Sequence, residues 1–411
     1  MASTAPGVLI IVENLTVPVD RRVWQEALAL RQAGYAVSVI CPKGDSHVAP
    51  YEVLDGIHIF RHPLPFEGSG VPGFALEYGW ALAWEFALSV KVYWKVGFDV
   101  VQACNPPDLL FLIGAFWKYL FGKRFVFDHH DISPELYEAK FGRRGAIYRL
   151  LLWLEWLTFK TADVVISTND AFKSIAVGRG GAAADRVFVV RSTPDLAKFR
   201  RVAPDAALKN GRKTLVGYVG VMGAQDGVEL LIDAMDDLVN VKGRRDTQCA
   251  VVGSGPEFAR LRRMARDKGL ADYITFTGFL CGPQLLTAFS TFDVGVIPDP
   301  KNDYNDKISM NKVFEYMMLG IPFAAFDLDE TRRTAGDAAL YATNNSPSSL
   351  ANAIARLVDD VELSRKLSEA GQARARALLN WDRERPRLLL AYDKALAKPD
   401  VVLTPAIEPA R

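Results

Sequence analysis

The sequence has little cysteine. Only four cysteines, Cys41, Cys104, Cys249 and Cys281, occur in 411 residues, and no two of them form a Cys-x-x-Cys pair. This scarcity excludes a disulfide framework and a zinc cluster built from paired cysteines. We expect four free thiols that pack as small core residues in a reducing compartment.

The sequence also lacks an excess of either charge. Its 49 basic and 48 acidic residues give a formal net charge of +1, which argues against a dedicated nucleic-acid-binding protein. A composition that is 50% hydrophobic and 24% charged is that of a globular protein, so an intrinsically disordered chain is excluded.

Long hydrophobic runs are missing as well. The most apolar run in the later sequence, Leu109 to Phe121, is interrupted by Lys118 and is shorter than the ~20 residues that a membrane-spanning helix needs. The first apolar run, residues 8–12, follows no basic region, which favours a buried strand over a signal peptide. These features predict a cytoplasmic protein that is soluble or peripheral to a membrane.

Short apolar runs alternate with segments of helical periodicity along most of the chain. This alternation predicts an α/β protein whose sheets are mostly parallel and covered by helices on both faces. Asp20 is the predicted N-cap of the first helix, which ends before Gly34. The expected strands lie at residues 8–12, 36–41, 57–60, 99–103, 124–128, 163–167, 187–190, 215–221, 249–255, 273–278, 292–298 and 322–327.

The pattern pauses at residues 195–213, where prolines and charged residues predict a linker. We therefore expect two Rossmann-like, doubly wound domains that face a central cleft, where such sheets bind ligands. The predicted boundaries are 1–200 for the N-terminal domain, 201–380 for the C-terminal domain, 381–397 for a helix that packs back on the N-terminal domain, and 398–411 for a loose tail.

Two segments of the second half carry signals for ligand binding. In VVGSGPE, residues 251–257, Gly253 and Gly255 would let backbone amides approach a phosphate, although a tight turn without a ligand explains the glycines equally well. The spacing does not match Gly-x-Gly-x-x-Gly, so a nicotinamide site is not expected.

The second segment is DKISMNKVFEYMMLGIP, residues 306–322. Ser309 is the predicted N-cap of a helix that ends at Gly320 and Pro322, and Asn311 and Glu315 lie on one face of it. A carboxylate there can accept hydrogen bonds from both hydroxyls of a ribose, whereas composition alone favours a solvated helix face. The residues expected to face the core are Met310, Val313, Phe314 and Met317.

Ordered segments over residues 8–395 resemble the retaining glycosyltransferases of family 4, which have the GT-B fold of two facing Rossmann-like domains. The N-terminal segments are NLTVPVDRRVWQEALALRQAGYAVSVICP, CNPPDLL and FDHHDISPELY. The C-terminal segments are GYVGVMGAQDGVELLIDAM, VVGSGPE, ITFTGFL and NKVFEYMMLGIPFAAFDLDETR. The loop Ala224-Gln225-Asp226-Gly227 resembles the branch that contains transferases of O-antigen and exopolysaccharide synthesis.

The resemblance implies roles in donor binding for specific residues. Glu315 matches the second glutamate of the family's Glu-x7-Glu motif and is expected to bind the donor ribose. Met310 and Asn311 match positions whose backbone amides hold the diphosphate, and Phe279 and Leu280 match the segment that frames the base.

On the N-terminal side, His130 resembles the family histidine that faces the donor sugar and the leaving phosphate. We prefer it to His129 because the family pattern is a histidine followed by an acidic residue, here Asp131. Asp20, Arg21 and Arg22 lie in the loop after the first strand, which faces the cleft, and are predicted to contact the acceptor or a phosphate, with Asp20 and Arg21 assigned to the acceptor side. The helix-cap interpretation of Asp20 is at least as well supported.

Three positions depart from the family pattern. The first glutamate of the motif is replaced by Lys307, and the Arg and Lys that grip the diphosphate fall at Val221 and Asp226. Our hypothesis is that Lys307, with Lys312 as a weaker candidate, supplies the missing positive charge. An inactive relative is the competing explanation.

The triplet Asp327-Leu328-Asp329 resembles the metal-binding Asp-x-Asp of the other glycosyltransferase fold. Because the resemblance here is to GT-B enzymes, which need no metal, we expect neither a metal nor a cofactor. Asp329 and Glu330 are instead predicted to contact the donor sugar.

Seven of the eight tryptophans fall in the first 156 residues, close to basic residues. Such a mixture is typical of a bilayer interface, and a core role for the aromatic residues is about equally compatible with it. The resemblance implies a lipid-linked oligosaccharide acceptor, so we predict peripheral association with the inner membrane face. The tryptophans are Trp24, Trp80, Trp84, Trp94, Trp117, Trp153 and Trp156, and the basic residues are Lys91, Lys95, Lys118, Lys123, Arg124, Arg143, Arg144 and Arg149.

The activity implied by the resemblance is transfer of a sugar from a nucleotide-diphosphate donor, UDP more than GDP, to a glycan hydroxyl with retention of configuration. No carboxylate occupies a nucleophile's place, so the resemblance implies a front-side displacement. Two alternatives stay open, namely a nucleotide-sugar epimerase and a nucleotide-sugar-binding subunit without activity.

Overall fold

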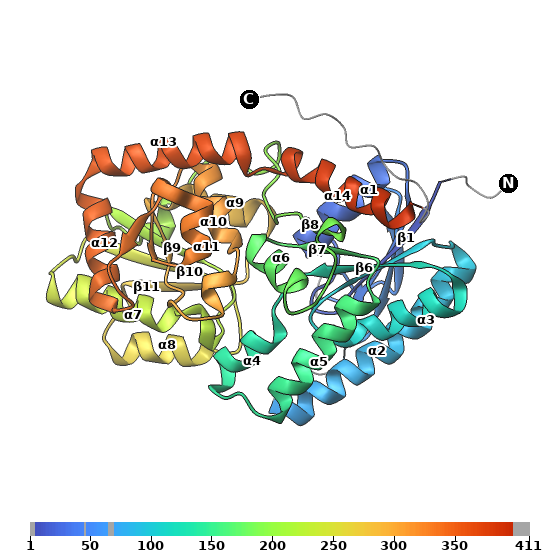
Figure 1. The fold of residues 1–411 in the computed structure, drawn as a ribbon. Helices are drawn as coiled ribbons and strands as arrows, with labels where there is room; N and C mark the ends of the chain where they lie inside the picture. The colour runs from blue at the N-terminus through green and yellow to red at the C-terminus, as the bar shows by residue number, and fades with distance from the viewer. Residues whose placement is uncertain (1–4, 45–46, 65–69, 398–411) are drawn as a thin grey trace.

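The computed structural model describes residues 5–44, 47–64 and 70–397. The tail predicted at residues 398–411 therefore lies outside the described residues. The described chain forms two α/β domains, each with a sheet covered by helices on both faces (Figure 1), which confirms the predicted fold class.

The first domain contains an eight-stranded sheet in the order β3-β4-β2-β1-β5-β6-β7-β8, in which only the edge pair β3 and β4 is antiparallel. Its elements are β1 (Gly7–Val12), α1 (Arg21–Gln32), β2 (Ala36–Pro42), β3 (Tyr51–Leu54), β4 (Ile57–His62), α2 (Gly70–Lys95), β5 (Val100–Cys104), α3 (Phe111–Phe121), β6 (Arg124–His129), α4 (Ser133–Phe141), α5 (Ala146–Thr161), β7 (Val164–Ser167), α6 (Asp170–Val177) and β8 (Val187–Val189).

The second domain contains a six-stranded parallel sheet in the order β11-β10-β9-β12-β13-β14. Its elements are β9 (Thr214–Val219), α7 (Val228–Asp236), β10 (Thr247–Val252), α8 (Phe258–Asp267), β11 (Ile274–Gly278), α9 (Gly282–Thr291), β12 (Val294–Ile297), α10 (Asn311–Leu319), β13 (Phe323–Phe326), α11 (Asp329–Ala335), β14 (Leu340–Ala342), α12 (Pro347–Asp359) and α13 (Val361–Leu378). The last helix of the chain, α14 (Trp381–Leu396), follows them.

The order of strands locates the ligand-binding edge of each sheet. In the first sheet β1 lies between β2 and β5, and in the second β9 lies between β10 and β12. The chain therefore winds in opposite directions from β1 and from β9, and doubly wound sheets bind ligands at this switch point, beyond the carboxyl ends of the strands. The loops after β1, β5, β9 and β12 are consequently the candidate ligand loops.

Helix α1 begins as the sequence predicts. The Asp20 side chain accepts a hydrogen bond from the Val23 amide (3.0 Å), which makes it the N-cap. Val23, Ala27 and Leu30 are fully buried in the core of the first domain, and Gly34 follows the helix with φ of 97°. This cap fixes the start of α1 and therefore the directions in which the side chains of its first two residues, Arg21 and Arg22, project.

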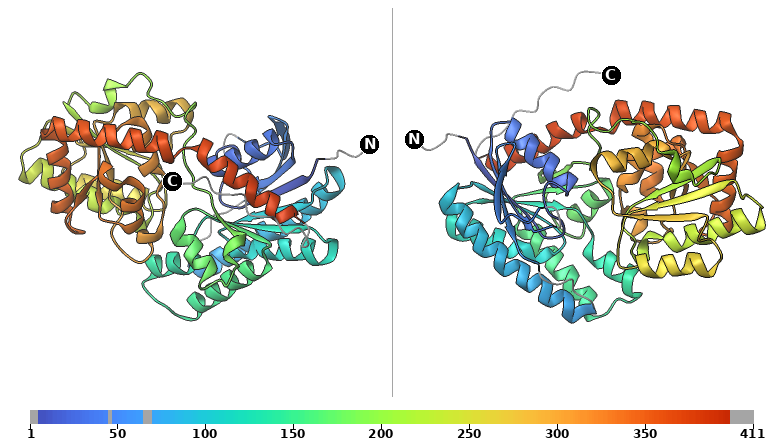
Figure 2. Two further views of the ribbon diagram at one scale, coloured as in Figure 1. Left: turned by 45° about the horizontal axis from the view of Figure 1, so that its top comes forward. Right: turned by 180° about the vertical axis from the view of Figure 1, so that it is seen from behind.

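The last helix, α14, crosses from the second domain back onto the first (Figures 1 and 2). Trp381, Leu388 and Tyr392 belong to the hydrophobic core of the first domain. At the crossing, the amide of Trp381 donates a hydrogen bond to the carbonyl oxygen of Pro194 (3.2 Å), so the two passages of the chain between the domains lie side by side.

Two sequence-based expectations about burial are wrong in part. Cys281 is exposed ahead of α9, whereas the other three cysteines are buried. Trp117 is only 1% exposed and belongs to the core, so it is not available to an interface, and Trp24 is partly buried against the core. None of the helices in the described parts of the chain has the length and apolar character needed to cross a bilayer.

Helix α14 offers a direct test of how the second crossing contributes to stability. Leu388 is fully buried and Leu390, on the same helix, is 56% exposed. We expect Leu388→Ala to lower the free energy of unfolding of the first domain by about 2–5 kcal/mol, because it leaves a cavity. The matched Leu390→Ala variant is expected to change it by about 0.5 kcal/mol or less.

Urea unfolding followed by tryptophan fluorescence measures this difference, since all eight tryptophans lie in the first domain or at the start of α14. Equal losses in the two variants would contradict the packing of α14 on the first domain.

Candidate functional site

Helix α10 follows β12 and a short 3-10 helix, Asn305–Lys307, at the ligand-binding edge of the second sheet. Its N-cap is Met310, and no side chain caps it, so the prediction of Ser309 as the cap is wrong. The Ser309 hydroxyl instead donates to Glu330 (2.9 Å) and accepts a hydrogen bond from the Asn169 amide (3.0 Å). The serine is thus used to join three segments, and the first-turn amides of α10 are left without a side-chain acceptor.

Helix α10 is a buried helix. Met310, Val313, Phe314 and Met317 lie in the core of the second domain, as predicted, and Asn311 is the one residue of the helix that is exposed. The alternative of a solvated helix face is therefore wrong.

The carboxylate of Glu315 is only 3% exposed, yet it lies at the contact between the domains. Nη1 of Arg21, from the first turn of α1, lies 2.5 Å from its Oε1. A buried carboxylate without a cation would be strongly destabilising, so this ion pair compensates the charge of Glu315. The charge of Glu315 in turn raises the pKa of Arg21 above its usual value, although burial opposes it.

Lys312 forms an ion pair with Asp299 and not with Glu315. Its Nζ lies 2.8 Å from Oδ2 of Asp299, which follows β12, and 4.8 Å from the centre of the Tyr218 ring. Burial raises the pKa of Asp299, while the charge of Lys312 lowers it. Lys312 is itself 8% exposed, so it lies inside the second domain rather than free at its surface.

The loop after β9 contains the two positions where the family pattern has basic residues. Val221 is 61% exposed, and the Asp226 carboxylate accepts a hydrogen bond from the amide of Gly223 (2.8 Å). Burial and the neighbouring Asp299 raise the pKa of Asp226 to about 6, against the opposing charge of Lys312. Asp226 thus shapes the loop and brings no positive charge to it.

The glycines of VVGSGPE are explained by packing against the loop after β9. A Cβ on Gly253, which has φ of 131°, would lie 1.9 Å from the carbonyl oxygen of Gly220, and a Cβ on Gly255 would lie 2.6 Å from the backbone of Met222. Only glycine fits at such distances. The expected contact of these two glycines with a phosphate stays a prediction.

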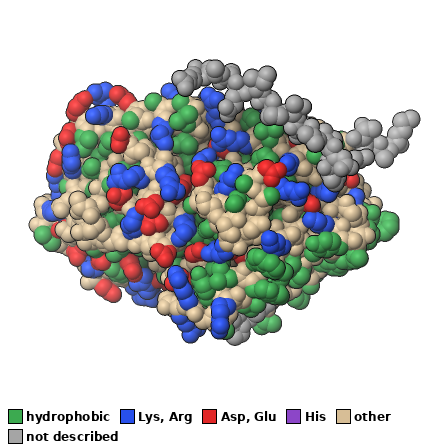
Figure 3. Space-filling view, viewed as in Figure 1, with side chains coloured by type: hydrophobic (Ala, Val, Ile, Leu, Met, Phe, Trp, Pro, Cys, Tyr) green, Lys and Arg blue, Asp and Glu red, His purple; other side chains and the backbone are tan. Residues whose placement is uncertain are grey.

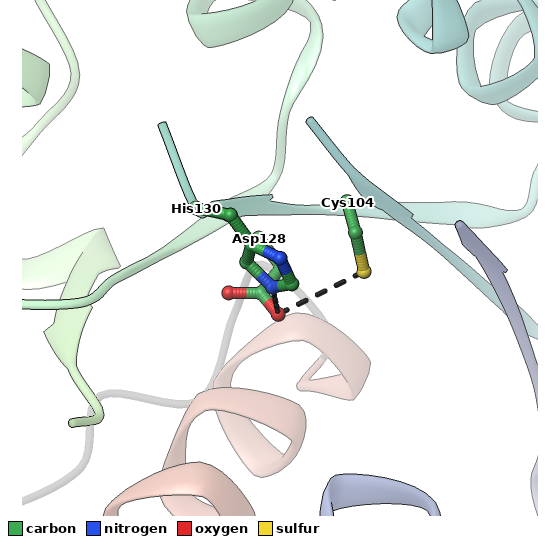
Figure 4. Close-up of side chains that lie close together, drawn as sticks. All are labelled: Cys104, Asp128 and His130. Atoms are coloured by element: carbon green, nitrogen blue, oxygen red, sulfur yellow. Dashed lines mark hydrogen bonds and ion pairs between the residues drawn. The ribbon is translucent and has the colours of Figure 1, made fainter. Parts of the chain in front are cut away.

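On the first domain, a buried ion pair lies beneath His130. The guanidinium of Arg22 contacts Asp128 (2.7 Å) at the end of β6, and Nε2 of His130 lies 2.5 Å from the same carboxylate (Figure 4). Burial would raise the pKa of Asp128, but the charges of Arg22 and His130 outweigh burial and hold it below its usual range. Asp128 is therefore ionised, and Nε2 of His130 also accepts a hydrogen bond from Nε of Arg22 (2.9 Å).

Asp128 also connects this pair to β5 and α14. Nε2 of Gln102 donates hydrogen bonds to Asp128 (3.1 Å) and to Glu26 (2.8 Å), and the hydroxyl of Tyr392 donates to Oε1 of Gln102. Burial raises the pKa of Glu26 well above its usual value, and the charge of Asp128 adds to this. The cluster is thus a fully buried hydrogen-bonded network in which Arg22 and Asp128 carry the charges.

Cys104, Asp128 and His130 lie close enough together to suggest a metal site (Figure 4). The donor set does not fit one, because the Arg22 guanidinium already occupies Asp128 and would repel a cation. Burial, with the charge of Asp128, also raises the pKa of the Cys104 thiol well above its usual value, which disfavours the thiolate that a metal would need.

The two histidines of the DHHD segment have different environments. His129 is fully buried among aromatic rings, with Phe172 at 4.7 Å between ring centres, and burial lowers its pKa to about 3. His130 is 16% exposed, and its amide donates to the Asn105 side chain (2.8 Å) after β5. The structure therefore makes His130, not His129, the histidine that a ligand can reach.

Further contacts join the domains near His130. The hydroxyl of Tyr304, after β12, donates to the Asp131 carboxylate (3.1 Å), and the Asn169 side chain donates to the carbonyl oxygen of Lys307 (2.7 Å). Asp299, Asn169 and Tyr304 were missed by the sequence analysis. A polar residue directly after a buried strand was the available signal for Asp299 and Asn169, whereas nothing marked Tyr304.

The remaining candidates lie at the edge of this contact. Lys307 and Asp329 line a pocket of about 530 Å³ between α6 and the second domain, and Nζ of Lys307 contacts the carbonyl oxygen of Asp303. Asp329 forms an ion pair with Lys301 (2.7 Å), and Glu330 is buried. Their predicted contacts with diphosphate and sugar stay predictions.

The segment predicted to frame the base follows β11. Phe279 is 60% exposed, and Leu280 packs partly against the core of the second domain. An exposed aromatic side chain at the end of a strand is available for stacking on a base.

Models of two protein families match this chain. The model described as Glycosyltransferase Family 4 matches residues 19–198, and the model described as Glycosyl transferases group 1 matches residues 213–360. Each match coincides with one of the two domains.

Two curated relatives are similar over part of their length. An alpha-D-kanosaminyltransferase from Streptomyces kanamyceticus is 28% identical over 159 residues, which are 38% of this chain and 39% of that protein. A GDP-mannose-dependent alpha-(1-6)-phosphatidylinositol monomannoside mannosyltransferase from Mycobacterium tuberculosis is 27% identical over 177 residues, 42% of this chain and 45% of that protein. The matches thus span less than half of these relatives.

Solved structures are similar over nearly the whole chain. Sucrose-phosphate synthase from Thermosynechococcus elongatus has a TM-score of 0.75 at 21% identity and covers 95% of this chain and 98% of its own. Anabaena HepE in complex with UDP-glucose has a TM-score of 0.69 at 15% identity, with 94% and 99% covered. Together with the family models, these similarities confirm the predicted GT-B fold.

The environment of His129 predicts a dependence of stability on pH. Its folded-state pKa of about 3 lies below the ordinary 6.5, so the unfolded chain takes up a proton that the folded chain does not. Stability is therefore lost as pH falls below 6.5, by up to about 1.4 kcal/mol per pH unit from this one group.

A His129→Leu variant lacks this contribution. Urea unfolding at pH 7, 6 and 5, followed by tryptophan fluorescence, is expected to give a flatter pH dependence for the variant than for the wild-type chain. Parallel curves would show that His129 is not a buried neutral imidazole.

Proposed function

Because this chain joins a glycosyltransferase family 4 domain to a group 1 glycosyltransferase domain in one GT-B fold, we propose that it transfers a sugar from a nucleoside-diphosphate sugar to a hydroxyl of a glycan acceptor, with retention of anomeric configuration. The acceptor is proposed to be lipid-linked, in the synthesis of a cell-surface polysaccharide of the O-antigen or exopolysaccharide type.

The observation that carries this proposal is the position of Glu315. A carboxylate only 3% exposed lies on a helix beside the switch point of the second sheet and faces the first domain, where Arg21 contacts it. Carboxylates at such a place bind the paired hydroxyls of a ribose with charge-assisted hydrogen bonds. The first-turn amides of α10 suit the diphosphate of the same ligand.

The donor nucleotide is proposed to be UDP. The similarity in fold to HepE, a protein in complex with UDP-glucose, supports UDP, whereas the mycobacterial relative is GDP-mannose-dependent. The exposed Phe279 beside Leu280 would stack on either base. Both nucleotides therefore belong in the binding experiment.

The proposed reaction is a front-side displacement without a metal ion. The bond between the anomeric carbon and the diphosphate oxygen breaks, the acceptor oxygen bonds to the same face of that carbon, and the acceptor proton passes to the leaving phosphate. The products are the glycoside and the nucleoside diphosphate. His130, oriented by Asp128 and by the Asn105 side chain, contacts the sugar and the leaving phosphate.

The proposed membrane surface lies on α2, α3 and α5 of the first domain. Hydrophobic side chains gather over the part of the molecule where these helices lie (Figure 3). Trp94 is 80% exposed and Trp153 is 55% exposed, so the alternative of core aromatic residues does not hold for them. The exposed large hydrophobic residues of these helices are Leu76, Trp80, Trp84, Phe86, Trp94, Leu112, Tyr119, Leu120, Phe121, Leu150, Trp153 and Trp156.

The charges of these helices support an anionic partner. Of the acidic residues on these helices, Glu85 and Glu155 are buried and Glu77 is partly exposed, whereas Lys91 on α2 and Arg149 and Lys160 on α5 are exposed. Exposed indole rings between lysines and arginines favour the headgroup region of an anionic bilayer. This surface would place the chain on the inner face of the membrane, beside a lipid-linked acceptor.

A thermal-shift experiment tests donor binding. UDP or GDP at about 100 times its Kd is expected to stabilise the folded chain by about 2.7 kcal/mol and to raise its melting temperature. Glu315→Gln is expected to weaken nucleotide binding by about tenfold or more, because two hydrogen bonds lose the carboxylate charge. Glu362→Gln, at a position 75% exposed on α13, is the matched control.

Failure of both nucleotides to shift the melting temperature would contradict the proposed function. Product analysis with the binding nucleotide's sugar then tests transfer, and the anomeric configuration of the product tests retention.

Co-sedimentation with vesicles tests the membrane surface. The double variant Trp94→Ser and Trp153→Ser is expected to lower the partition onto anionic vesicles at low salt by about tenfold or more, since each ring gains roughly 1.5–3 kcal/mol on burial. The control is Val361→Ser, at a position 75% exposed on the second domain. If wild-type protein stays in the supernatant, the surface does not bind a bilayer.

A further inference from the structure

The contact between Arg21 and Glu315 joins two helices, α1 and α10, that belong to different domains. Arg21 is the first residue of α1, directly after its N-cap Asp20, and Glu315 lies in the second turn of α10. The Arg21 side chain is 51% exposed, whereas the Glu315 side chain is 3% exposed. A partly exposed arginine side chain is therefore held at the buried carboxylate that is expected to bind the ribose.

Among the described residues of the second domain, neither the loop after β9 nor Lys312 supplies a free cation at this place. Its loop after β9, residues 220–227, contains no basic residue, and Asp226 folds back on Gly223. Lys312 is paired with the buried Asp299. A diphosphate with two or three negative charges that binds between α10 and this loop therefore meets acidic side chains there and needs a cation from elsewhere.

Lys307 and Arg21 are two candidate cations at the contact between the domains. Nζ of Lys307 is taken up by the carbonyl oxygen of Asp303, and this lysine lines the pocket next to α6. Arg21, on α1, instead contacts Glu315, which lies one turn after Asn311 on α10, the helix that carries the proposed diphosphate-binding amides. Its planar guanidinium matches the oxygens of two phosphates with paired hydrogen bonds, which an ammonium cannot do.

We propose that Arg21 is the residue that binds the donor diphosphate, so that the first domain supplies the positive charge absent from the loop after β9. This inference rests on the proposed function and assigns Arg21 to the donor instead of the acceptor. The ribose hydroxyls bind the oxygens of Glu315, so donor binding separates Arg21 from Glu315. Glu315 then contacts the ribose, and Arg21 contacts the diphosphate. The guanidinium then neutralises the charge that gathers on the leaving diphosphate as the glycosidic bond breaks.

Exchange of partners at Glu315 makes a specific thermodynamic prediction. Arg21 favours binding of the phosphates and competes with the ribose for Glu315. Its removal is therefore expected to weaken the binding of a nucleoside diphosphate and to leave the binding of a nucleoside intact. The quantity to measure is the ratio of the Kd of uridine to the Kd of UDP, or the same ratio for guanosine and GDP if the chain binds GDP.

Isothermal titration calorimetry of the full chain measures this ratio. In Arg21→Gln, which keeps a hydrogen-bond donor for Glu315, the ratio is expected to fall by about tenfold to hundredfold, the equivalent of one or two charge-assisted hydrogen bonds. In Arg21→Lys it is expected to fall by a smaller factor. Uridine itself is expected to bind Arg21→Gln at least as tightly as it binds wild-type protein.

The controls separate the possible outcomes. Arg31→Ala removes an equal charge from the exposed end of α1 and is expected to leave the ratio unchanged. An unchanged ratio in Arg21→Gln would overturn the inference, as would a fall seen in Lys307→Ala instead. Equal weakening of uridine and UDP would overturn it too, by giving Arg21 a purely structural role. A wild-type chain that binds neither UDP nor GDP would contradict the proposed function itself.

Discussion

The ion pair between Arg22 and Asp128 holds the ligand side of the first domain together. Arg22 leaves α1 beside its N-cap and contacts the end of β6, and its Nη1 also donates to the carbonyl oxygen of Val190 after β8 (2.8 Å). Asp128 in turn binds His130 and Gln102, and Gln102 receives the hydroxyl of Tyr392 from α14. Removal of either charged partner would leave the other buried and unpaired, so the position of His130 depends on this pair.

Much of the fold could be predicted from the sequence, because buried parallel strands give continuous apolar runs such as residues 8–12. β3 was missed because it is a half-exposed edge strand whose composition alternates weakly. Its signal was the turn Asp55-Gly56, where both residues have positive φ (49° and 77°), as expected for a tight hairpin. β14, with three residues, is too short for any periodicity to reveal.

The candidate site was predictable only where local sequence determines it. The motif around Glu315 and the choice of His130 over His129 came from resemblance, and the structure gives the two histidines clearly different exposures. The partner of Glu315 could not be predicted, since it depends on how two separate sheets face each other. Trp117 and Trp94 show the same limit on a smaller scale, because two tryptophans in similar apolar helices are 1% and 80% exposed according to the helix face they occupy.

The chain passes between its domains twice, and the hydrogen bond between Trp381 and Pro194 keeps the two passages adjacent. Two domains joined by two adjacent connections can rotate about the hinge axis that runs through both connections. They are less free to twist or to slide past each other than two domains joined by one flexible connection. Arg21 lies on the first domain and Glu315 lies on the second domain. The position of the Arg21 guanidinium relative to an anion bound on the second domain therefore depends mainly on one hinge angle.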